Sequence, residues 1–310
     1  MASLCFGHGR YTHAMRASLL GLCLLSAVTP AWSDDLKCTP SSSDSPTVIT
    51  TTLGATPALV RVPARISKPP IILWHGFGPP DSERALMNAL PLDDVPAVKV
   101  YLGLPMFGAR ALAPGELGRR QKQDLGTLVF EPVVMGAAKE LPAVVRALEQ
   151  HGCMKSGAAI GLFGFSAGGA SVLYALAESD VRIGVAVTLN ASTGLSASVK
   201  AFERATKGSY EWTDATRALA QRSDAASRAK DIAARAQPPA LLIVHGADDA
   251  MLTPSVAVTL HAALQPLYAK ANATQRLQLT VMPGLAHAWV DTGNAEALRG
   301  SIGAWFHSYL

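Results

Sequence analysis

The sequence predicts one α/β domain with a mostly parallel sheet and helices on both of its faces. Short apolar segments alternate with segments of helical periodicity from residue 47 to residue 309, which is the pattern of strand–helix–strand units. The segment 158–163 is apolar without alternation, as expected of a strand buried on both faces. The chain has 310 residues, of which 49% are hydrophobic and 16% charged, and this composition suits one large folded domain.

Eight apolar segments are expected to form the strands of one sheet. The eight segments lie at 48–52, 59–62, 71–74, 97–102, 158–163, 184–189, 240–244 and 277–282. The first two are predicted to pair as a hairpin. Helices are expected in the intervals, at 82–89, 132–151, 167–177, 255–271 and 295–309. Residues 194–236 interrupt the alternation and have a mostly helical composition. We expect a small helical cap over an active site there, with a solvent-exposed crossover helix as the alternative.

Residues 1–33 have the features of a secretory signal peptide. Arg10 and Arg16 supply a positive N-terminal region, 17–28 is an apolar run, and Ala31-Trp32-Ser33 offers small residues at a cleavage site. The apolar run is short compared with the roughly 20 residues that span a bilayer. We therefore expect cleavage, export to the periplasm or the medium, and no stable membrane span afterwards. An uncleaved membrane anchor is the alternative.

The charge distribution gives no sign of nucleic-acid binding. The net charge is +4, and the predicted signal peptide accounts for two of these charges because it contains two arginines and no acidic residue. No cluster of Lys and Arg with interleaved aromatic residues occurs in the rest of the chain. Residues 34–46 are polar and rich in Ser and Pro, and we expect them to form a flexible lead-in to a domain over 47–310.

Two of the four cysteines, Cys5 and Cys23, lie in the predicted signal peptide. The mature chain would keep Cys38 and Cys153, and in an exported protein these two can form one disulfide. Two free thiols are the alternative. The cysteines lack the spacing of a zinc site, so we expect no structural metal.

The pentapeptide Gly164-Phe165-Ser166-Ala167-Gly168 lies between a predicted buried strand and a predicted helix. This strand–turn–helix context is typical of a nucleophile elbow, in which a tight turn exposes the serine hydroxyl above the sheet. We therefore predict that Ser166 is a nucleophile. The alternative is a serine that only caps the helix.

A serine hydroxyl needs an adjacent base, and His287 is the best placed of the eight histidines. It follows the predicted strand 277–282 in a loop near the end of the chain, whereas His151, His261 and His307 lie in predicted helices. His245 lies beside the expected acid, where we expect it to shape a turn.

The acid that orients the histidine is expected directly after a strand on the same edge of the sheet. The segment that follows strand 240–244 contains Asp248 and Asp249, and we predict Asp249, with Asp248 as the alternative. The corresponding position after strand 184–189 is Asn190, which is not a carboxylate.

An oxyanion produced by the reaction would need two N–H donors. We predict the backbone N–H of Ala167, which follows the nucleophile, and the N–H of Phe77 in the loop His75-Gly76-Phe77-Gly78. Apolar residues on nearby loops are expected to form the substrate pocket, namely Phe77, Met106, Phe107, Leu285 and Trp289.

Taken together, these motifs resemble the α/β-hydrolase superfamily, in particular its small esterase, dienelactone-hydrolase and prolyl-oligopeptidase-like members. The resemblance covers residues 47–309 and rests on His75-Gly76-Phe77-Gly78, the serine pentapeptide, the His-Gly-x-x-Asp segment and the late histidine. The order Ser166, Asp249, His287 is the order of this superfamily. Unlike true dienelactone hydrolases, which use cysteine, this chain has a serine, and it lacks the β-propeller of the large prolyl peptidases.

The motifs are specific to the superfamily and not to any substrate. Our leading hypothesis is hydrolysis of a small carboxylic ester through an acyl-enzyme, for which no metal or organic cofactor is needed. Cleavage of a short peptide or an amide by the same three residues is the alternative, because the histidine can also protonate an amine leaving group. A third possibility is a binding protein that has this fold without activity, for which the loss of one of the three residues would be the usual sign.

Overall fold

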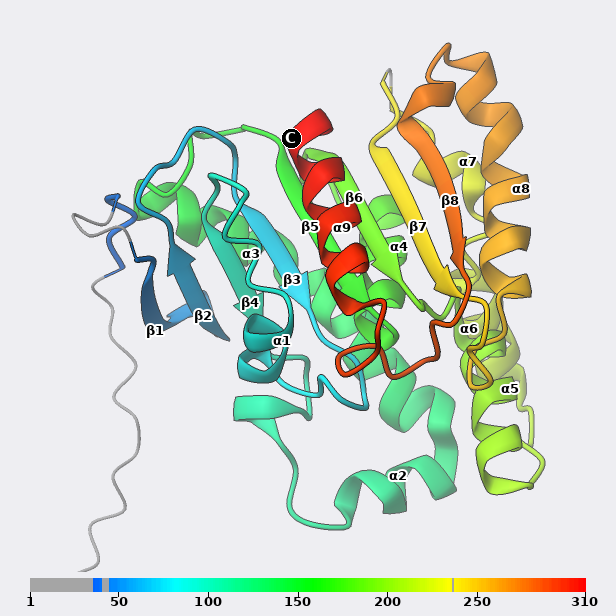
Figure 1. Ribbon diagram of the computed structural model, residues 1–310. Helices are drawn as coiled ribbons and strands as arrows, with labels where there is room; N and C mark the ends of the chain where they lie inside the picture. The colour runs from blue at the N-terminus through cyan, green and yellow to red at the C-terminus, as the bar shows by residue number, and fades with distance from the viewer. Residues whose placement is uncertain (1–35, 41–44, 236) are drawn as a thin grey trace, which may run out of the picture. The chain divides into compact units, whose positions relative to one another are not determined.

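The computed structural model describes residues 36–40, 45–235 and 237–310, and its centre is a single eight-stranded sheet (Figure 1). The strand order is β1-β2-β4-β3-β5-β6-β7-β8. The strands are β1 (Thr47–Leu53), β2 (Thr56–Val62), β3 (Ile71–Trp74), β4 (Lys99–Leu102), β5 (Ile160–Phe165), β6 (Ile183–Leu189), β7 (Ala240–Gly246) and β8 (Leu277–Met282).

The sheet is mostly parallel, as predicted, with an antiparallel edge. From β4 to β8 all neighbouring strands are parallel, whereas β1 pairs with β2 and β2 with β4 in the antiparallel sense. Leu53 is paired with Thr56, so a two-residue turn joins β1 to β2. Gly54 occupies that turn with a φ of 63°, a left-handed conformation that glycine adopts without steric cost.

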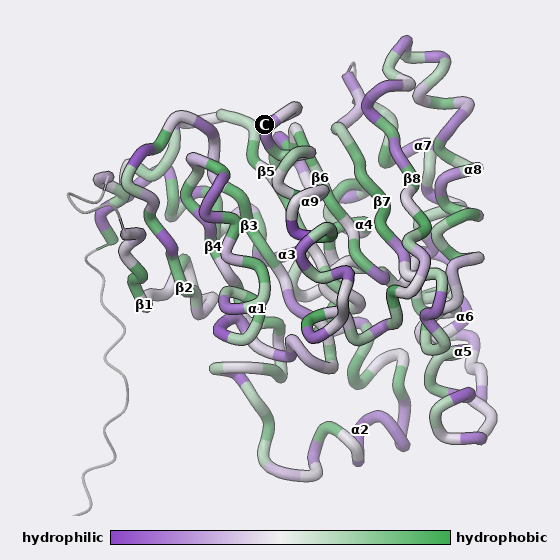
Figure 2. Tube along the Cα trace, viewed as in Figure 1, coloured by the Kyte–Doolittle hydropathy of each residue, from purple (hydrophilic) through white to green (hydrophobic). Residues whose placement is uncertain are grey.

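Helices cover both faces of the sheet. One face carries α1 (Glu83–Ala89) and α9 (Ala295–Tyr309), and the other carries α3 (Gly136–Gln150), α4 (Ala167–Glu178) and α8 (Ser255–Lys270) (Figure 1). The buried apolar side chains accordingly form two clusters, one on each side of the sheet. All six residues of β5 are buried, which explains the absence of polar alternation in its sequence. In Figure 2 the central strands are mostly hydrophobic.

The region 194–236 is helical in the structure, as its composition indicates. It contains α5 (Leu195–Thr206), α6 (Asp214–Ser223) and α7 (Ala229–Ile232). Thr213 caps α6, since its hydroxyl accepts the N–H of Thr216 at 3.2 Å. Short helical turns also occur at η1 (Gly108–Arg110) and η3 (Thr274–Arg276).

A further helical segment between β4 and α3 was not predicted. It consists of α2 (Glu116–Leu125) and most of the π-helical η2 (Gly126–Met135). The helix that we expected at 132–151 corresponds to the end of η2 together with α3. Asp124, with φ of −163° and ψ of 100°, interrupts the helical backbone between α2 and η2. The sequence 116–125 is strongly polar, so it lacks the hydrophobic stripe that marks a core-facing helix (Figure 2).

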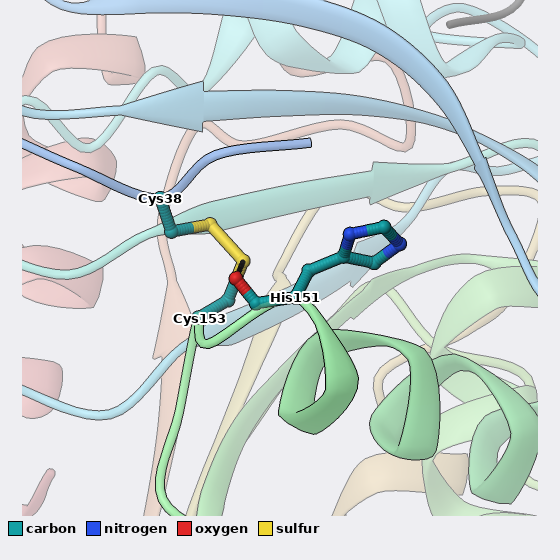
Figure 3. The surroundings of a disulfide bond; sticks show 3 residues. All are labelled: Cys38, His151 and Cys153. Atoms are coloured by element: carbon teal, nitrogen blue, oxygen red, sulfur yellow. Dashed lines mark hydrogen bonds between the residues drawn. A yellow bond between two sulfur atoms is a disulfide. The ribbon is translucent and has the colours of Figure 1, made fainter. Parts of the chain in front are cut away.

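A disulfide joins Cys38 to Cys153, which lies just after α3 (Figure 3). Leu36, two residues before Cys38, is only 3% exposed and packs in the core. The described part of the predicted flexible lead-in, 36–40, is therefore anchored to the domain, which differs from our expectation for 34–46. The predicted signal peptide, 1–33, with Cys5 and Cys23, lies outside the described residues.

In the described ranges, no helix combines the length and the apolar character needed to cross a lipid bilayer.

Candidate active site

Ser166 lies in the sharp turn between β5 and α4, with φ of 53° and ψ of −114°. A positive φ is uncommon for serine, and such backbone strain concentrates at functional sites. The turn is tight enough to require glycine on both sides. A Cβ atom on Gly164 would lie 2.2 Å from the carbonyl oxygen of Gly168, and one on Gly168 would lie 2.4 Å from that of His75. The glycines of the pentapeptide therefore follow from steric necessity.

The structure brings Ser166, His287 and Asp249 together in one hydrogen-bonded chain. Nδ1 of His287 is 2.7 Å from Oδ2 of Asp249, and Nε2 is 3.1 Å from Oγ of Ser166. A carboxylate oxygen can only accept a hydrogen bond, so Nδ1 carries the proton and donates a hydrogen bond to Asp249. Nε2 of the neutral ring is then free to accept the hydrogen bond that the Ser166 hydroxyl donates.

Asp249, the preferred residue, accepts the hydrogen bond of His287 and is only 3% exposed, whereas Asp248 is exposed. The second oxygen of Asp249, Oδ1, accepts the backbone N–H groups of Met251 at 2.9 Å and Leu252 at 2.8 Å. Burial by itself would raise the pKa of Asp249, but hydrogen bonds from His245, His287 and the backbone hold it below its usual range. The side chain is therefore a carboxylate at neutral pH.

His245 closes the loop that carries Asp249, in agreement with its expected part in shaping a turn. Its Nε2 lies 2.6 Å from the carbonyl oxygen of Leu252 and 3.4 Å from Oδ2 of Asp249. The two ends of the loop are thus held together by one buried imidazole.

Asn190 is a residue whose importance to the site sequence reasoning missed. It is fully buried at the end of β6 with a φ of 44°. Its Nδ2 donates to the carbonyl oxygens of Ala286 at 2.9 Å and His287 at 3.2 Å, and its Oδ1 accepts the N–H of Gly246 at 2.7 Å. One amide therefore fixes the backbone of His287 relative to the end of β7, where the loop of Asp249 begins. The only sequence signal is its position directly after a parallel strand.

His75 anchors the loop that contains Phe77. Its Nδ1 donates to the carbonyl oxygen of Gly76 at 2.7 Å, and its Nε2 accepts the N–H of Leu104 at 3.0 Å. Burial lowers the pKa of His75 to about 4, so the ring is neutral at neutral pH, in the protonation state that this pair of bonds needs.

The two predicted oxyanion donors lie in the wall of the same cavity as Ser166. Within the described part of the chain, the N–H groups of Phe77 and Ala167 have no protein acceptor. Both are thus available to a ligand, and Ala167 lies in the first turn of α4, where N–H groups point toward an anion.

A cavity of about 310 Å³ adjoins Ser166 and His287. One wall comes from α2 and one from α5, and among the lining residues none is Asp, Glu, Lys or Arg. The lining consists of Phe77, Gly78, Gln121, Leu125, Ser166, Ala167, Ser192, Ser198, Ala201, Phe202, Ala205, Met251, Leu252 and His287. The contribution of α2 was not predicted, because its polar sequence has no motif.

Four of the residues expected in the pocket wall do not line this cavity, and these predictions were wrong. Leu285 and Trp289 are fully buried in the core beneath the site, where Trp289 packs against Phe165 with ring centroids 6.1 Å apart. The ring of Phe107 stacks on that of Phe77 with the centroids 4.8 Å apart, and so it packs against the loop of Phe77. Met106 is partly buried and packs against the core. Their loops reach the site, but their side chains turn into the protein because packing there is more favourable than exposure.

The described residues contain no group of three or more His, Cys, Asp or Glu side chains that could hold a metal ion.

Solved structures with the same fold include both esterases and peptidases. A Thermus thermophilus protein superposes with a TM-score of 0.62 at 20% identity, covering 84% of this chain and 98% of that one. A Pyrococcus furiosus esterase superposes with a TM-score of 0.57 at 15% identity, covering 85% of this chain and 92% of the esterase. A puromycin-hydrolysing peptidase of Mycobacterium tuberculosis gives 0.59 at 16% identity, covering 86% of this chain but only 39% of the peptidase. These likenesses show that the chain shares the fold of these structures.

Comparison with curated protein sequences gave no match. The prolyl oligopeptidase family, in contrast, matches residues 136–310, more than half of the chain. The match includes the serine turn, the loop of Asp249 and His287, and together with the fold it supports a serine hydrolase. The chain belongs to the prolyl oligopeptidase family.

Proposed function

We propose that this protein hydrolyses uncharged carboxylic esters, with Ser166 as nucleophile, His287 as general base and Asp249 as the acid that orients the histidine. The observation that carries the proposal is the hydrogen-bonded chain from Ser166 through His287 to the carboxylate of Asp249, with distances of 3.1 and 2.7 Å. This arrangement is how a weakly nucleophilic hydroxyl becomes reactive at neutral pH.

In the first half of the reaction, Nε2 of His287 takes the proton of Ser166 as Oγ attacks the ester carbonyl carbon. The negative charge that develops on the carbonyl oxygen would be held by the N–H groups of Phe77 and Ala167. The imidazolium, stabilised by Asp249, then returns the proton to the departing alkoxide, which leaves an acyl-enzyme. Removal of one oxyanion donor typically lowers turnover by about 10² to 10³-fold.

In the second half, water takes the place of the leaving alcohol. Nε2 of His287 accepts a proton from the water, whose oxygen attacks the acyl carbon. Collapse of the second tetrahedral intermediate returns the proton to Oγ of Ser166 and releases the carboxylic acid. These steps need no redox change: the Ser166 proton leaves with the alcohol in the first half, and water supplies the proton that returns to Ser166 in the second.

The walls of the cavity favour an uncharged substrate. No ionisable side chain other than His287 lines it, and most of the larger side chains, among them Leu125 and Phe202, are apolar. A charged group placed there would lose its hydration without gaining a partner. An ester with an apolar acyl group fits this environment.

Cleavage of a peptide or amide bond is the second candidate, and membership of the prolyl oligopeptidase family favours it. The esterase likeness spans nearly the whole of the related structure, whereas the peptidase likeness spans 39% of it. No carboxylate lines the cavity to hold a free amino terminus, so we place ester hydrolysis first.

We also propose that the protein is exported to the periplasm or the medium. The features of residues 1–33 support this proposal, and the disulfide between Cys38 and Cys153 suits an oxidising compartment. N-terminal sequencing of the mature protein is expected to begin at Asp34. Recovery of an intact N-terminus from the membrane fraction would contradict it.

Labelling with a fluorophosphonate tests the proposed nucleophile. Peptide mass spectrometry of the treated protein is expected to place the adduct on Ser166 and to find none in the folded His287→Ala variant. Adduct formation on another serine would exclude the proposed nucleophile. Matched p-nitrophenyl esters and p-nitroanilides then separate the two candidate functions. A higher kcat/KM on the anilides than on the esters would place amide hydrolysis ahead of ester hydrolysis.

A further inference from the structure

The two helical walls of the cavity come from segments far apart in the sequence. Gln121 and Leu125 belong to α2, whereas Ala201, Phe202 and Ala205 belong to α5. The space between these walls is the space open to a group bound beside Ser166. Whatever holds the walls at their separation therefore decides which groups enter, provided that the proposed function is correct.

Asp124, directly before Leu125, is held rigidly at the junction of α2 and η2. Its Oδ1 accepts the N–H groups of Gly126 at 2.8 Å and Thr127 at 3.2 Å, and its Oδ2 accepts the hydroxyl of Thr127 at 2.6 Å. Partial burial acts to raise the pKa of Asp124, but these hydrogen bonds and one from Tyr210 lower it overall, so the side chain is ionised at neutral pH.

Tyr210 follows α5 and reaches across to this carboxylate. Its hydroxyl donates to Oδ1 of Asp124 at 2.6 Å, while its own N–H donates to Glu203 of α5 at 2.9 Å. The ring also packs edge-on against Trp212, with centroids 5.0 Å apart. Gly126 makes room for the phenol, because a Cβ there would lie 2.8 Å from the Tyr210 oxygen. Asp124 is thus held at the end of the α2 wall, and Tyr210 is held to the α5 wall.

We propose that Asp124 and Tyr210 form a clasp that holds the two walls of the cavity together and so limits the size of the acyl group that Ser166 can accept. A hydrogen bond to an ionised acceptor is about twice as strong as one between neutral groups. A neighbouring ion pair, from Arg222 of α6 to Glu131 of η2, is longer at 3.6 Å and exposed, so it contributes little. Neither clasp residue lines the cavity, so the clasp acts through Leu125 and α5.

The variant Tyr210→Phe tests the clasp because it removes one hydroxyl and keeps the ring. We expect kcat/KM for p-nitrophenyl octanoate, relative to the acetate ester, to rise at least about fivefold, since separated walls admit a longer chain. The value for acetate itself is expected to stay within about twofold of wild type, because the three catalytic residues are untouched. Asp124→Asn keeps an oxygen acceptor without the charge and is expected to change the ratio in the same direction by less.

Tyr268→Phe is the matched control. Its hydroxyl donates to the carbonyl oxygen of Pro239 at 2.8 Å in a fully buried location outside the cavity lining. This variant is expected to lower the Tm without changing the octanoate-to-acetate ratio. Ala205→Trp adds bulk to the α5 wall at an exposed position and is expected to lower the ratio at least about fivefold.

The outcomes distinguish this inference from the proposed function on which it rests. If wild-type protein is labelled at Ser166 and Tyr210→Phe and Asp124→Asn fold with an unchanged ratio, the clasp is overturned and the proposed function stands. If Tyr210→Phe does not fold, the ratio in Asp124→Asn decides. If folded wild-type protein is neither labelled nor active on esters, the proposed function fails and the inference fails with it.

Discussion

Asn190 shows how one buried side chain organises several backbone segments. Its amide provides two donors and one acceptor, and each has a partner from the loop of His287 or the end of β7. Aspartate has nearly the same shape but no donors at neutral pH. The substitution would leave two carbonyl oxygens facing a negative charge, which costs free energy in a buried site.

Asn190→Asp is accordingly expected to lower kcat by about 10 to 10²-fold, because a small displacement of His287 lengthens its bond to Ser166. KM is expected to change much less, since Asn190 does not line the cavity. Steady-state kinetics on a p-nitrophenyl ester provide the measurement. Asn272→Asp, at an exposed asparagine that also has a positive φ of 51°, is the control. Equal losses in both variants would refute the positioning role of Asn190.

At the scale of elements, the disulfide links the chain before β1 to the turn after α3. The two cysteines are 115 residues apart, so the bond closes a long loop and strongly restricts the unfolded chain. It lies away from the cavity lining, and it should therefore affect stability rather than catalysis.

Replacing both cysteines with serine is expected to lower the free energy of unfolding by about 2–5 kcal/mol, with little change in kcat/KM of the folded protein. Urea denaturation of wild type and variant gives the difference. Addition of a reductant is expected to lower the free energy of unfolding of the wild-type protein to that of the variant and to leave the value for the variant unchanged. A variant as stable as oxidised wild type would show that the bond is absent in solution.

At the scale of the whole molecule, the buried charge of Lys99 affects the free energy of unfolding. It is fully buried in β4, and its Nζ donates to the carbonyl oxygen of Val95 at 3.1 Å. Burial lowers the pKa of Lys99 from 10.5 to about 8, partly offset by the carboxylate of Asp93. Between these two pH values the unfolded chain keeps a proton that the folded chain has lost. Stability from this group therefore rises with pH across that window.

Lys99→Met removes the cost of the buried charge. At neutral pH the variant is expected to gain up to about 3 kcal/mol of stability relative to wild type, less the lost hydrogen bond to Val95. The gain should shrink as the pH rises from about 8 to 10.5. Urea denaturation over this range measures it, with Lys155→Met at an exposed position as control. A pH-independent difference would argue against titration of Lys99.

The sequence by itself determined the fold class and the three residues of the hydrogen-bonded chain. Strand and helix patterns are local, because they arise from the periodicity of a short segment. The turn around Ser166 is also local, since close approach of its own backbone demands the glycines. Asp249 and His287 each follow a parallel strand, and parallel strands end at the same edge of the sheet.

Only the tertiary structure decided the walls of the cavity and the residues that hold the site in place. Leu285 and Trp289 were expected at the cavity and lie in the core, whereas Gln121 and Leu125 line it from a helix with no recognisable motif. The contacts of Asn190 and the clasp join residues 56 to 97 positions apart. Such contacts depend on how whole elements pack, and no local pattern in the chain encodes which side chains will meet.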